Sequence, residues 1–438
     1  MNKVAIHNLG CKVNSYESES MEQLLKKAGF EIIPFDENEV ADIYIINTCS
    51  VTNIADRKSR QMLHKAKKMN PDAIVIAAGC YVNADVEKAA QDNSVDIVLG
   101  NNNKINIVEV IRQYCQDHNK NRLVTDINSE SSYEELKIDE VNEHTRAYIK
   151  IQDGCNQFCS YCIIPYTRGR IRSRLLPDIL DEVRVLVEKG YKEIVLTGIH
   201  LSSYGMDNNC GSLLEVIVEL SKIDKLERIR LGSLEPRIIT EEFVSTISSI
   251  SKVCPHFHLS LQSGCDTVLK RMNRKYNSKE YYEKCTILRK YYDNPAITTD
   301  IIVGFPGETN EEFNITEEFI KKVNFYEVHV FKYSRRKGTL ADKMPDQIDD
   351  VIKTERSNIL LSLTSHMKKE YIESYIGTTQ KVLVEEKSII DGNEYSYGYT
   401  PNYIRVHFPS DEKIRIKSNV DIKLLSVDEC GIVTGHLV

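Results

Sequence analysis

Short apolar segments alternate with helix-like segments over the first 124 residues. Residues 17–28 and 54–69 have helical spacing of apolar positions. Strands rich in Val, Ile and Ala that alternate with helices are typical of a parallel sheet with helices on both faces. The pattern therefore predicts a doubly wound α/β domain over residues 1–124. The expected strands lie at residues 4–10, 42–49, 73–80 and 94–100.

Three further segments follow along the chain. Residues 125–143 are polar and acidic without apolar periodicity, which predicts a linker. Residues 144–373 contain six strand-like segments separated by helical ones, which predicts a partial (β/α)6 barrel with its chemistry at the carboxyl ends of the strands. Residues 374–438 contain short strands and turns, which predicts a small antiparallel β-barrel.

Composition narrows the class of protein. No apolar run reaches the roughly 18 residues that a membrane helix needs, and the N-terminal segment lacks signal-peptide features. We therefore expect a cytoplasmic protein without a membrane partner. In that compartment the 12 cysteines favour metal binding or catalysis over disulfides. The net charge of -7 argues against a generally basic nucleic-acid binder, so RNA contacts must come from local patches, and no DNA partner is expected.

The strongest chemical signal is a C-x3-C-x2-C loop directly after a predicted strand. It comprises Cys155, Cys159 and Cys162. Three thiolates on one loop can bind three irons of a 4Fe-4S cluster and leave the fourth iron open to another ligand. Structural zinc is the alternative, but zinc usually takes four ligands, and no nearby Cys or His pair completes such a set.

Three other cysteines each stand where an apolar strand gives way to a loop. They are Cys11, Cys49 and Cys80. In a parallel sheet these strand ends share one edge, so the thiols are expected to converge and hold a second cluster. A free cysteine is more often a small buried apolar residue, and that interpretation is kept for the remaining cysteines of the chain.

The loop around Cys155, with Tyr161 between its last two cysteines, resembles the signature of the radical S-adenosylmethionine (SAM) superfamily. The resemblance implies that the open iron binds SAM and that an injected electron yields a 5′-deoxyadenosyl radical. Other barrel segments resemble those that surround the cofactor, although each glycine among them is also consistent with an ordinary turn. The candidate cofactor-binding residues are Tyr161, Gly198, Ser233, Glu235, Gln262 and Gly304.

The whole chain is similar to the methylthiotransferases, on the blocks LGCKVNSYESE, RGRIRSR, SLEP, LQSGCD and DIIVGFPGE. The resemblance implies hydrogen removal by the barrel cluster, sulfur from the N-terminal cluster and a methyl group from a second SAM. The resemblance also implies an electron donor of flavodoxin or ferredoxin type and proteins that deliver sulfur and assemble clusters. No catalytic residue beyond the cluster ligands is assigned.

Three blocks, LGCKVNSYESE, TGIHLSSYG and GYTPNYIRV, look most like the branch that modifies C2 of N6-threonylcarbamoyladenosine beside the tRNA anticodon. The isopentenyladenosine branch typically has a sequence like YGCQMN at the first of these blocks. A third branch modifies an aspartate of a ribosomal protein. Both are alternatives here, and a non-catalytic, metal-stabilised RNA-binding protein is the alternative from another class.

Two segments are candidates for contact with the tRNA anticodon stem-loop. The run after the central cysteines carries Arg168, Arg170, Arg172 and Arg174, and phosphate contacts supply much of RNA affinity. The basic run at residues 57–68 is equally consistent with a solvated helix face. The C-terminal barrel resembles the RNA-binding TRAM module, in which aromatic side chains stack on bases. The candidate aromatic residues are Tyr399 and Tyr403, with Tyr395, Tyr397 and Phe408.

Overall fold

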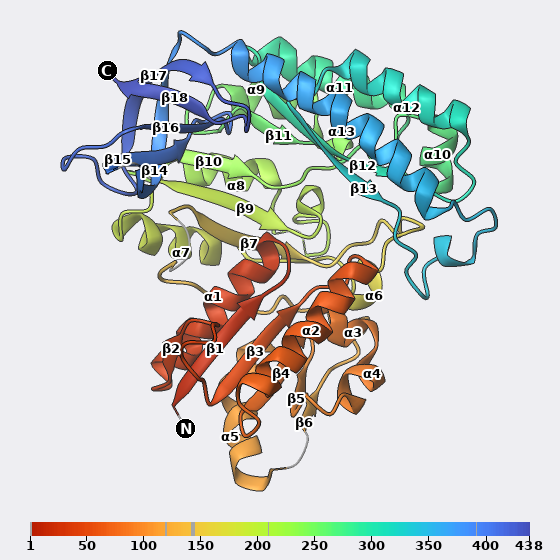
Figure 1. The fold of residues 1–438 in the computed structure, drawn as a ribbon, viewed down its shortest axis with the longest axis vertical. Coiled ribbons are helices and arrows are strands. Elements are labelled where there is room, and N and C mark those ends of the chain that lie inside the picture. The colour runs from red at the N-terminus through yellow and green to blue at the C-terminus, as the bar shows by residue number, and fades with distance from the viewer. Residues whose placement is uncertain (1, 119–120, 142–144, 209, 391) are drawn as a thin grey trace.

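The computed structural model describes residues 2–118, 121–141, 145–208, 210–390 and 392–438. Its three structural units are an N-terminal α/β unit, a partial barrel above it in Figure 1, and a small β-barrel formed by the C-terminal segment. The predicted fold class is confirmed. Among the described residues, none of the helices is both long and apolar enough to span a bilayer.

The N-terminal unit is a parallel sheet with helices on both faces. Its elements are β1 (Lys3–Asn8), α1 (Lys12–Lys27), β2 (Glu31–Ile33), β3 (Ile43–Thr48), α2 (Asn53–Met69), β4 (Ile74–Gly79), α3 (Cys80–Ala84), α4 (Val86–Gln91), β5 (Ile97–Leu99), η1 (Lys104–Asn106), α5 (Ile107–Asp117) and β6 (Asn121–Leu123). The strand order is β2-β1-β3-β4-β5-β6. Alternate residues of β3 face opposite layers: Ile43 and Ile45 pack with α1 and α5, and Tyr44 and Ile46 pack with α2. Because β1, β3 and β4 are parallel neighbours, their carboxyl ends share one edge of the sheet.

The central unit is a partial barrel of six parallel strands. Its elements are β7 (Ala147–Asp153), α6 (Ile164–Thr167), β8 (Arg172–Ser173), α7 (Leu176–Glu188), β9 (Glu193–Gly198), η2 (Leu201–Ser203), α8 (Leu213–Ser221), β10 (Arg228–Leu231), η3 (Pro236–Ile238), α9 (Glu241–Ser248), β11 (His256–His258), α10 (Asp266–Arg271), α11 (Ser278–Tyr291), β12 (Ala296–Val303), α12 (Asn310–Val323), β13 (Glu327–Lys332), η4 (Ala341–Lys343) and α13 (Asp350–Glu373). The barrel strands run in the order β7-β9-β10-β11-β12-β13, and isolated bridges such as Leu234 to Leu259 join its two sheets. The short β8 pairs antiparallel with β7.

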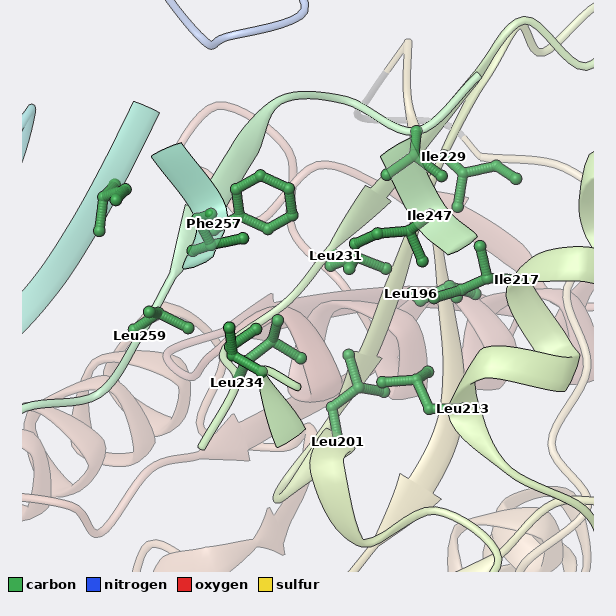
Figure 2. Packing of buried hydrophobic residues seen from close by; sticks show 14 of the residues in the cluster. Leu196, Leu201, Leu213, Ile217, Ile229, Leu231, Leu234, Ile247, Phe257 and Leu259 are labelled. Carbon is green, nitrogen blue, oxygen red and sulfur yellow. The ribbon is translucent and has the colours of Figure 1, made fainter. Parts of the chain in front are cut away.

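The barrel core lies between the strands and the outer helices. Figure 2 shows Leu196 of β9 and Leu231 of β10 beside Ile217 of α8 and Ile247 of α9. These side chains are at most 1% exposed. Burial of this kind stabilises the fold by about 1.5–3 kcal/mol for each large aliphatic side chain. The core therefore fixes the strands whose ends carry the candidate site.

The C-terminal unit is a closed barrel of β14 (Thr379–Ile390), β15 (Asn393–Tyr399), β16 (Arg405–Pro409), β17 (Asn419–Val427) and β18 (Val433–Leu437). Its strand order is β14-β15-β16-β18-β17, and all neighbours are antiparallel except β16 and β18. Arg228 on β10 docks this barrel by donating to the carbonyls of Tyr399 at 2.9 Å and Lys381 at 2.7 Å. Its identity as a TRAM module stays a prediction.

The predicted linker at residues 125–143 has no helix or strand among its described residues, and residues 142–144 lie outside them. It is packed rather than solvated, because Leu136 and Ile138 are buried in the barrel core. The carbonyl of Leu136 also accepts a hydrogen bond from the hydroxyl of Tyr16 in α1. This segment therefore fastens the N-terminal unit to the barrel. The exact domain bounds 1–124, 144–373 and 374–438 stay a prediction.

Candidate active site

The central cysteines lie on the loop that follows β7. Gly154 precedes this loop with a φ of +70°, and a Cβ there would collide with the carbonyl of Arg170. Glycine is therefore required for the loop to turn back on itself. The N–H of Cys162 donates to the carbonyl of Cys159 at 3.0 Å, which tightens the end of the loop.

The three thiols of this loop form a donor set suited to an iron–sulfur cluster. Burial, with charge repulsion from Cys159, raises the pKa of Cys155 to about 11 and that of Cys162 to about 12. Arg274 Nη1 donates to the sulfur of Cys159 at 3.2 Å, and the Gln157 N–H donates to that of Cys155 at 3.4 Å. N–H donors of this kind stabilise thiolates, and metal binding removes the thiol protons.

The N-terminal cysteines converge at the shared strand edge. Cys11 caps the start of α1, Cys49 follows β3, and Cys80 opens α3 directly after β4. Burial, with smaller contributions from the charges of Cys80 and Cys11, raises the pKa of Cys49 to about 11. Asn14 of α1 donates to the carbonyl of Thr48 at 3.1 Å, and the N–H of Tyr81 donates to Thr48 Oγ1 at 3.2 Å, so the three cysteine-bearing segments adjoin. As a set of free thiols the three cysteines too fit an iron–sulfur cluster.

Arg168 links the two groups of cysteines. Its Nε donates to the sulfur of Cys80 at 3.3 Å, and its Nη1 lies 3.2 Å from the carboxylate of Asp153, two residues before Cys155. Its Nη2 donates to Asn14 Oδ1 at 3.0 Å. The side chain is fully buried. One guanidinium group therefore contacts both cysteine-bearing segments.

A buried ion network surrounds this arginine. Glu17 of α1 lies 2.8 Å from Lys104 Nζ, 2.8 Å from Lys150 Nζ and 2.8 Å from Arg168 Nη1. Burial alone would raise the pKa of Glu17, but these three cations lower it well below its ordinary value of 4.5. Lys150 and Arg168 likewise lower the pKa of Asp153. The network holds the N-terminal unit against the barrel by charge pairing.

The arginine run does not form the phosphate-binding surface that the sequence predicts. Arg168, Arg172 and Arg174 are fully buried, because carboxylates of the fold take up their charges. Arg174 pairs with Glu182, and Arg172 lies 3.8 Å from Asp153. Only Arg170 of the run is exposed; it covers the ring of Phe158 at 4.5 Å, and its contact with RNA stays a prediction.

Two candidate cofactor residues line one cavity beside the central cysteines. Tyr161 and Gln262 border a space of about 260 Å³, together with Val51 and Thr52 from the loop after Cys49. Gln262 has a φ of +75°, an uncommon conformation that often marks functional sites. The cavity is therefore flanked by both cysteine-bearing units. Its volume lies just below the usual range for ligand pockets, so it suits part of a bound cofactor or substrate.

The other four candidate cofactor-binding residues lie at or near the ends of barrel strands, and their contacts differ. Ser233 lines a second cavity, of about 380 Å³. Glu235 accepts from Arg237 Nε at 2.7 Å, and a Cβ on Gly198 would crowd the side chain of Gln152. The N–H of Gly304 donates to Glu308 at 2.7 Å. Structural partners explain Gly198, Glu235 and Gly304, so their cofactor roles stay predictions.

The aromatic candidates of the C-terminal barrel differ in accessibility. The rings of Tyr399 and Tyr403 stack at 4.7 Å, and the guanidinium group of Arg146 lies over both. Both rings are half-buried at the junction with the partial barrel. Phe408 is fully buried in the barrel core and therefore cannot stack on a base.

Several residues of the site carry no recognisable sequence signal. Arg274 lies in a charged stretch after α10 and contacts Cys159 only through the fold. His258 Nε2 lies 3.2 Å from Asp300 Oδ2, and the ligand atoms of His258, Asp300 and His329 lie within 4.8 Å of one another. Among these residues, Asp153 could have been found from the sequence. It stands two positions before Cys155 at the end of an apolar strand, where a carboxylate suggests an ion pair.

Comparison with known proteins identifies both units of the site. A family described as "Uncharacterized protein family UPF0004" matches residues 3–100, and the "Radical SAM superfamily" matches residues 149–320. The chain is 41% identical to the "Threonylcarbamoyladenosine tRNA methylthiotransferase MtaB" of Bacillus subtilis (strain 168), over 97% of this chain and 94% of that protein. It is 36% identical to a "tRNA-2-methylthio-N(6)-dimethylallyladenosine synthase" of Finegoldia magna, over 98% of this chain and 93% of that protein.

A solved structure shares the fold. It is the radical S-adenosylmethionine methyltransferase TsrM of Kitasatospora setae with cobalamin and a [4Fe-4S] cluster bound, which superposes with a TM-score of 0.57 at 15% identity. The match covers 90% of this chain and 82% of that one. At this identity the likeness extends to the arrangement of the α/β unit and the barrel, and not to the reaction.

Proposed function

Because the chain belongs to the radical SAM methylthiotransferase family, we propose that it adds a methylthio group to C2 of N6-threonylcarbamoyladenosine next to the anticodon of tRNA. The observation that carries this proposal is the pair of cysteine triads, set at the strand ends of two units and linked by Arg168. Radical formation and sulfur delivery need separate open coordination sites. A chain with two adjacent triads offers both.

The residues that would hold the cofactors follow from this geometry. Cys155, Cys159 and Cys162 would hold one 4Fe-4S cluster and Cys11, Cys49 and Cys80 the other. When bound, the clusters and S-adenosyl-L-methionine supply the radical that removes hydrogen, the sulfur and the methyl group. We assign Tyr161 and Gln262 to the walls of the SAM site, since both line the cavity beside the cysteine loop.

The chain itself positions the reacting groups. The hydrogen bonds from Arg274 and Arg168 to cysteine sulfurs fix the orientation of one thiolate in each triad. Ile302 and Phe331 add apolar surface to the 260 Å³ cavity. The buried pairs of Glu17 hold the two units in register, so the distance between the triads is set by the fold.

We propose that the anticodon stem-loop approaches over the opening between the two units. Val51 and Ile54 are 54% and 58% exposed there, beside the cavity and at the start of α2. Arg57 and Lys58 on α2 and the exposed Arg170 supply cationic groups for the phosphates. Tyr399 and Tyr403 are weaker candidates, because Arg146 already covers their rings.

The proposed reaction also requires partner proteins that supply electrons and sulfur. Cleavage of SAM consumes an electron, for which we propose a donor of flavodoxin or ferredoxin type. Each turnover consumes a sulfur atom, so proteins that deliver sulfur and assemble clusters are required. We place the reaction in the cytoplasm, where these partners and tRNA meet.

Mass spectrometry of tRNA nucleosides tests the substrate. A strain that lacks this gene should lose the methylthio group from threonylcarbamoyladenosine and keep the parent nucleoside, and the gene on a plasmid should restore it. Loss from dimethylallyladenosine instead would favour the second activity named among the relatives. An unchanged nucleoside profile would contradict a tRNA substrate and favour the ribosomal-protein alternative.

A further inference from the structure

The 380 Å³ cavity lies where all three structural units meet. Lys12 enters it from the start of α1, Ser233 and His256 border it from the partial barrel, and Tyr403 closes it from the C-terminal barrel. Lys12 directly follows Cys11, so the cavity adjoins the N-terminal cysteines. Its volume is at the small end of the range for ligand pockets, which suits one small polar group.

Two arginines of the cavity wall already have ion-pair partners. Arg146 Nε lies 2.6 Å from Glu385 Oε1, and Arg230 Nε lies 2.7 Å from Glu193 Oε1. Arg230 also donates to the carbonyl of Pro401 at 2.8 Å. These guanidinium groups therefore act as structural walls.

Lys12 differs from them. Within the part of the chain that the structure describes, its ammonium group has neither a hydrogen-bond partner nor an ion-pair partner. Of the two acids of the cavity, Glu327 lies 2.5 Å from Lys368 Nζ, and Asp300 lies 3.2 Å from Nε2 of His258, which borders the same cavity. Lys12 is exposed and borders this cavity without an ion-pair partner among the described residues, so it can attract an anion that enters.

His256 adds a hydrogen-bonding group beside this cation. The residue is 9% exposed, and its Nδ1 has no hydrogen-bond partner among the described residues. Burial lowers its pKa, and the cationic side chains around it, Arg230 and Lys12 first, lower it further. A neutral imidazole with one unpaired nitrogen can bind a carboxylate or a hydroxyl, according to its tautomer. An unpaired nitrogen and an unpaired ammonium group therefore share this cavity.

The geometry of adenine connects this cavity to the target base. C2 and N6 flank N1 on one edge of the ring, whereas the ribose and phosphate attach at the far side. Because Lys12 directly follows Cys11 and lines the cavity, a base that presents C2 to the N-terminal cysteines can direct its N6 substituent toward Lys12. A threonylcarbamoyl group ends in a carboxylate and a hydroxyl, which match the cation and the hydrogen-bonding groups.

We propose that Lys12, with His256 and Ser233, binds the carboxylate of the N6 substituent and thereby selects an adenosine whose substituent is anionic. This inference rests on the proposed function, because it assumes threonylcarbamoyladenosine as the target. A neutral, apolar substituent such as dimethylallyl would displace water near Lys12 and give its charge no partner, which is unfavourable.

The test compares two RNA ligands on the reconstituted full-length enzyme. One anticodon stem-loop carries threonylcarbamoyladenosine and the other its methyl ester, which removes only the negative charge. For Lys12→Gln we expect binding of the acid, measured by fluorescence anisotropy, to weaken by about 10- to 100-fold, the range of a charge-assisted hydrogen bond. Binding of the ester should stay unchanged. Lys12→Arg should restore most of the affinity, and Lys26→Gln, at the exposed far end of α1, should have no effect.

Two results would overturn the inference alone. An equal loss for acid and ester would mean that Lys12 supports the cysteine loop, and unchanged binding of the acid would mean that it does not contact the substrate. Iron content and SAM cleavage without RNA, measured on each variant, report whether the site is intact. A wild-type enzyme that thiolates only dimethylallyladenosine or a protein would overturn the proposed substrate and this inference together.

Discussion

Arg168 donates a hydrogen bond from Nε to the sulfur of Cys80 at 3.3 Å, although 88 positions separate the two residues. Its other nitrogens contact Glu17 of α1 and Asp153 at the end of β7. A single buried side chain of the barrel unit thus orients a cysteine of the N-terminal unit. The relative placement of the two cysteine triads depends on this contact.

Replacement of Arg168 should therefore destabilise the whole chain. Arg168→Met leaves the buried carboxylates of Glu17 and Asp153 with fewer partners, and breaking such a pair costs about 3–5 kcal/mol. Urea denaturation of the metal-free protein at pH 7 measures this loss in the free energy of unfolding. Arg170→Met, two positions away and exposed, is the matched control and should cost less than about 1 kcal/mol. Equal effects of the two changes would contradict a structural role for the buried network.

The same network predicts a loss of stability in acid. The pKa of Glu17 lies well below 4.5 in the folded chain, so its contribution is complete above the unfolded value of 4.5 and is lost as the pH falls toward the folded pKa. Burial holds the folded pKa values of His200 and His256 below 6.5, so these groups already lower the urea midpoint of the metal-free protein below that pH, and the loss of the Glu17 contribution should add a further fall below pH 4.5. Glu17→Gln should flatten that acid decline while lowering stability at pH 7. A variant with the wild-type acid slope would show that other carboxylates carry the effect.

Arg274 should set the reduction potential of the barrel cluster. Its hydrogen bond to Cys159 stabilises negative charge on the sulfur, and reduction of the cluster adds negative charge. Arg274→Gln should therefore shift the potential to a more negative value, which a redox titration followed by electron paramagnetic resonance measures. Lys275→Gln, at the exposed neighbouring position, should leave the potential unchanged. A shift in the positive direction would contradict this role.

Sequence patterns were sufficient for the parts of the site that lie next to secondary structure. Cys155 follows a strand directly, and Cys49 and Cys80 end neighbouring strands, so periodicity and parallel topology placed them. Arg168 shows the limit of that reasoning. Its run looks like a phosphate-binding patch, and only the fold reveals that Glu17, 151 positions earlier, neutralises it.

The second cavity shows the same limit for binding residues. Lys12 lies within the block LGCKVNSYESE, but that resemblance gives it no role, and its role depends on whether an acid lies within reach. In the folded chain Glu327 pairs with Lys368 and Asp300 contacts His258, and neither forms an ion pair with Lys12. Such pairings depend on side-chain contacts between strands and helices, which apolar periodicity does not encode.

The assignment of separate roles to the two triads is tested most directly by one reaction on the reconstituted Cys49→Ala variant. The assay measures 5′-deoxyadenosine and the 2-methylthio nucleoside together, with tRNA that carries threonylcarbamoyladenosine. Because the Cys155 loop is intact in this variant, we predict that 5′-deoxyadenosine still forms and that the methylthio product is lost; Cys155→Ala should lose both. Methylthio product at the wild-type level from Cys49→Ala would contradict the account.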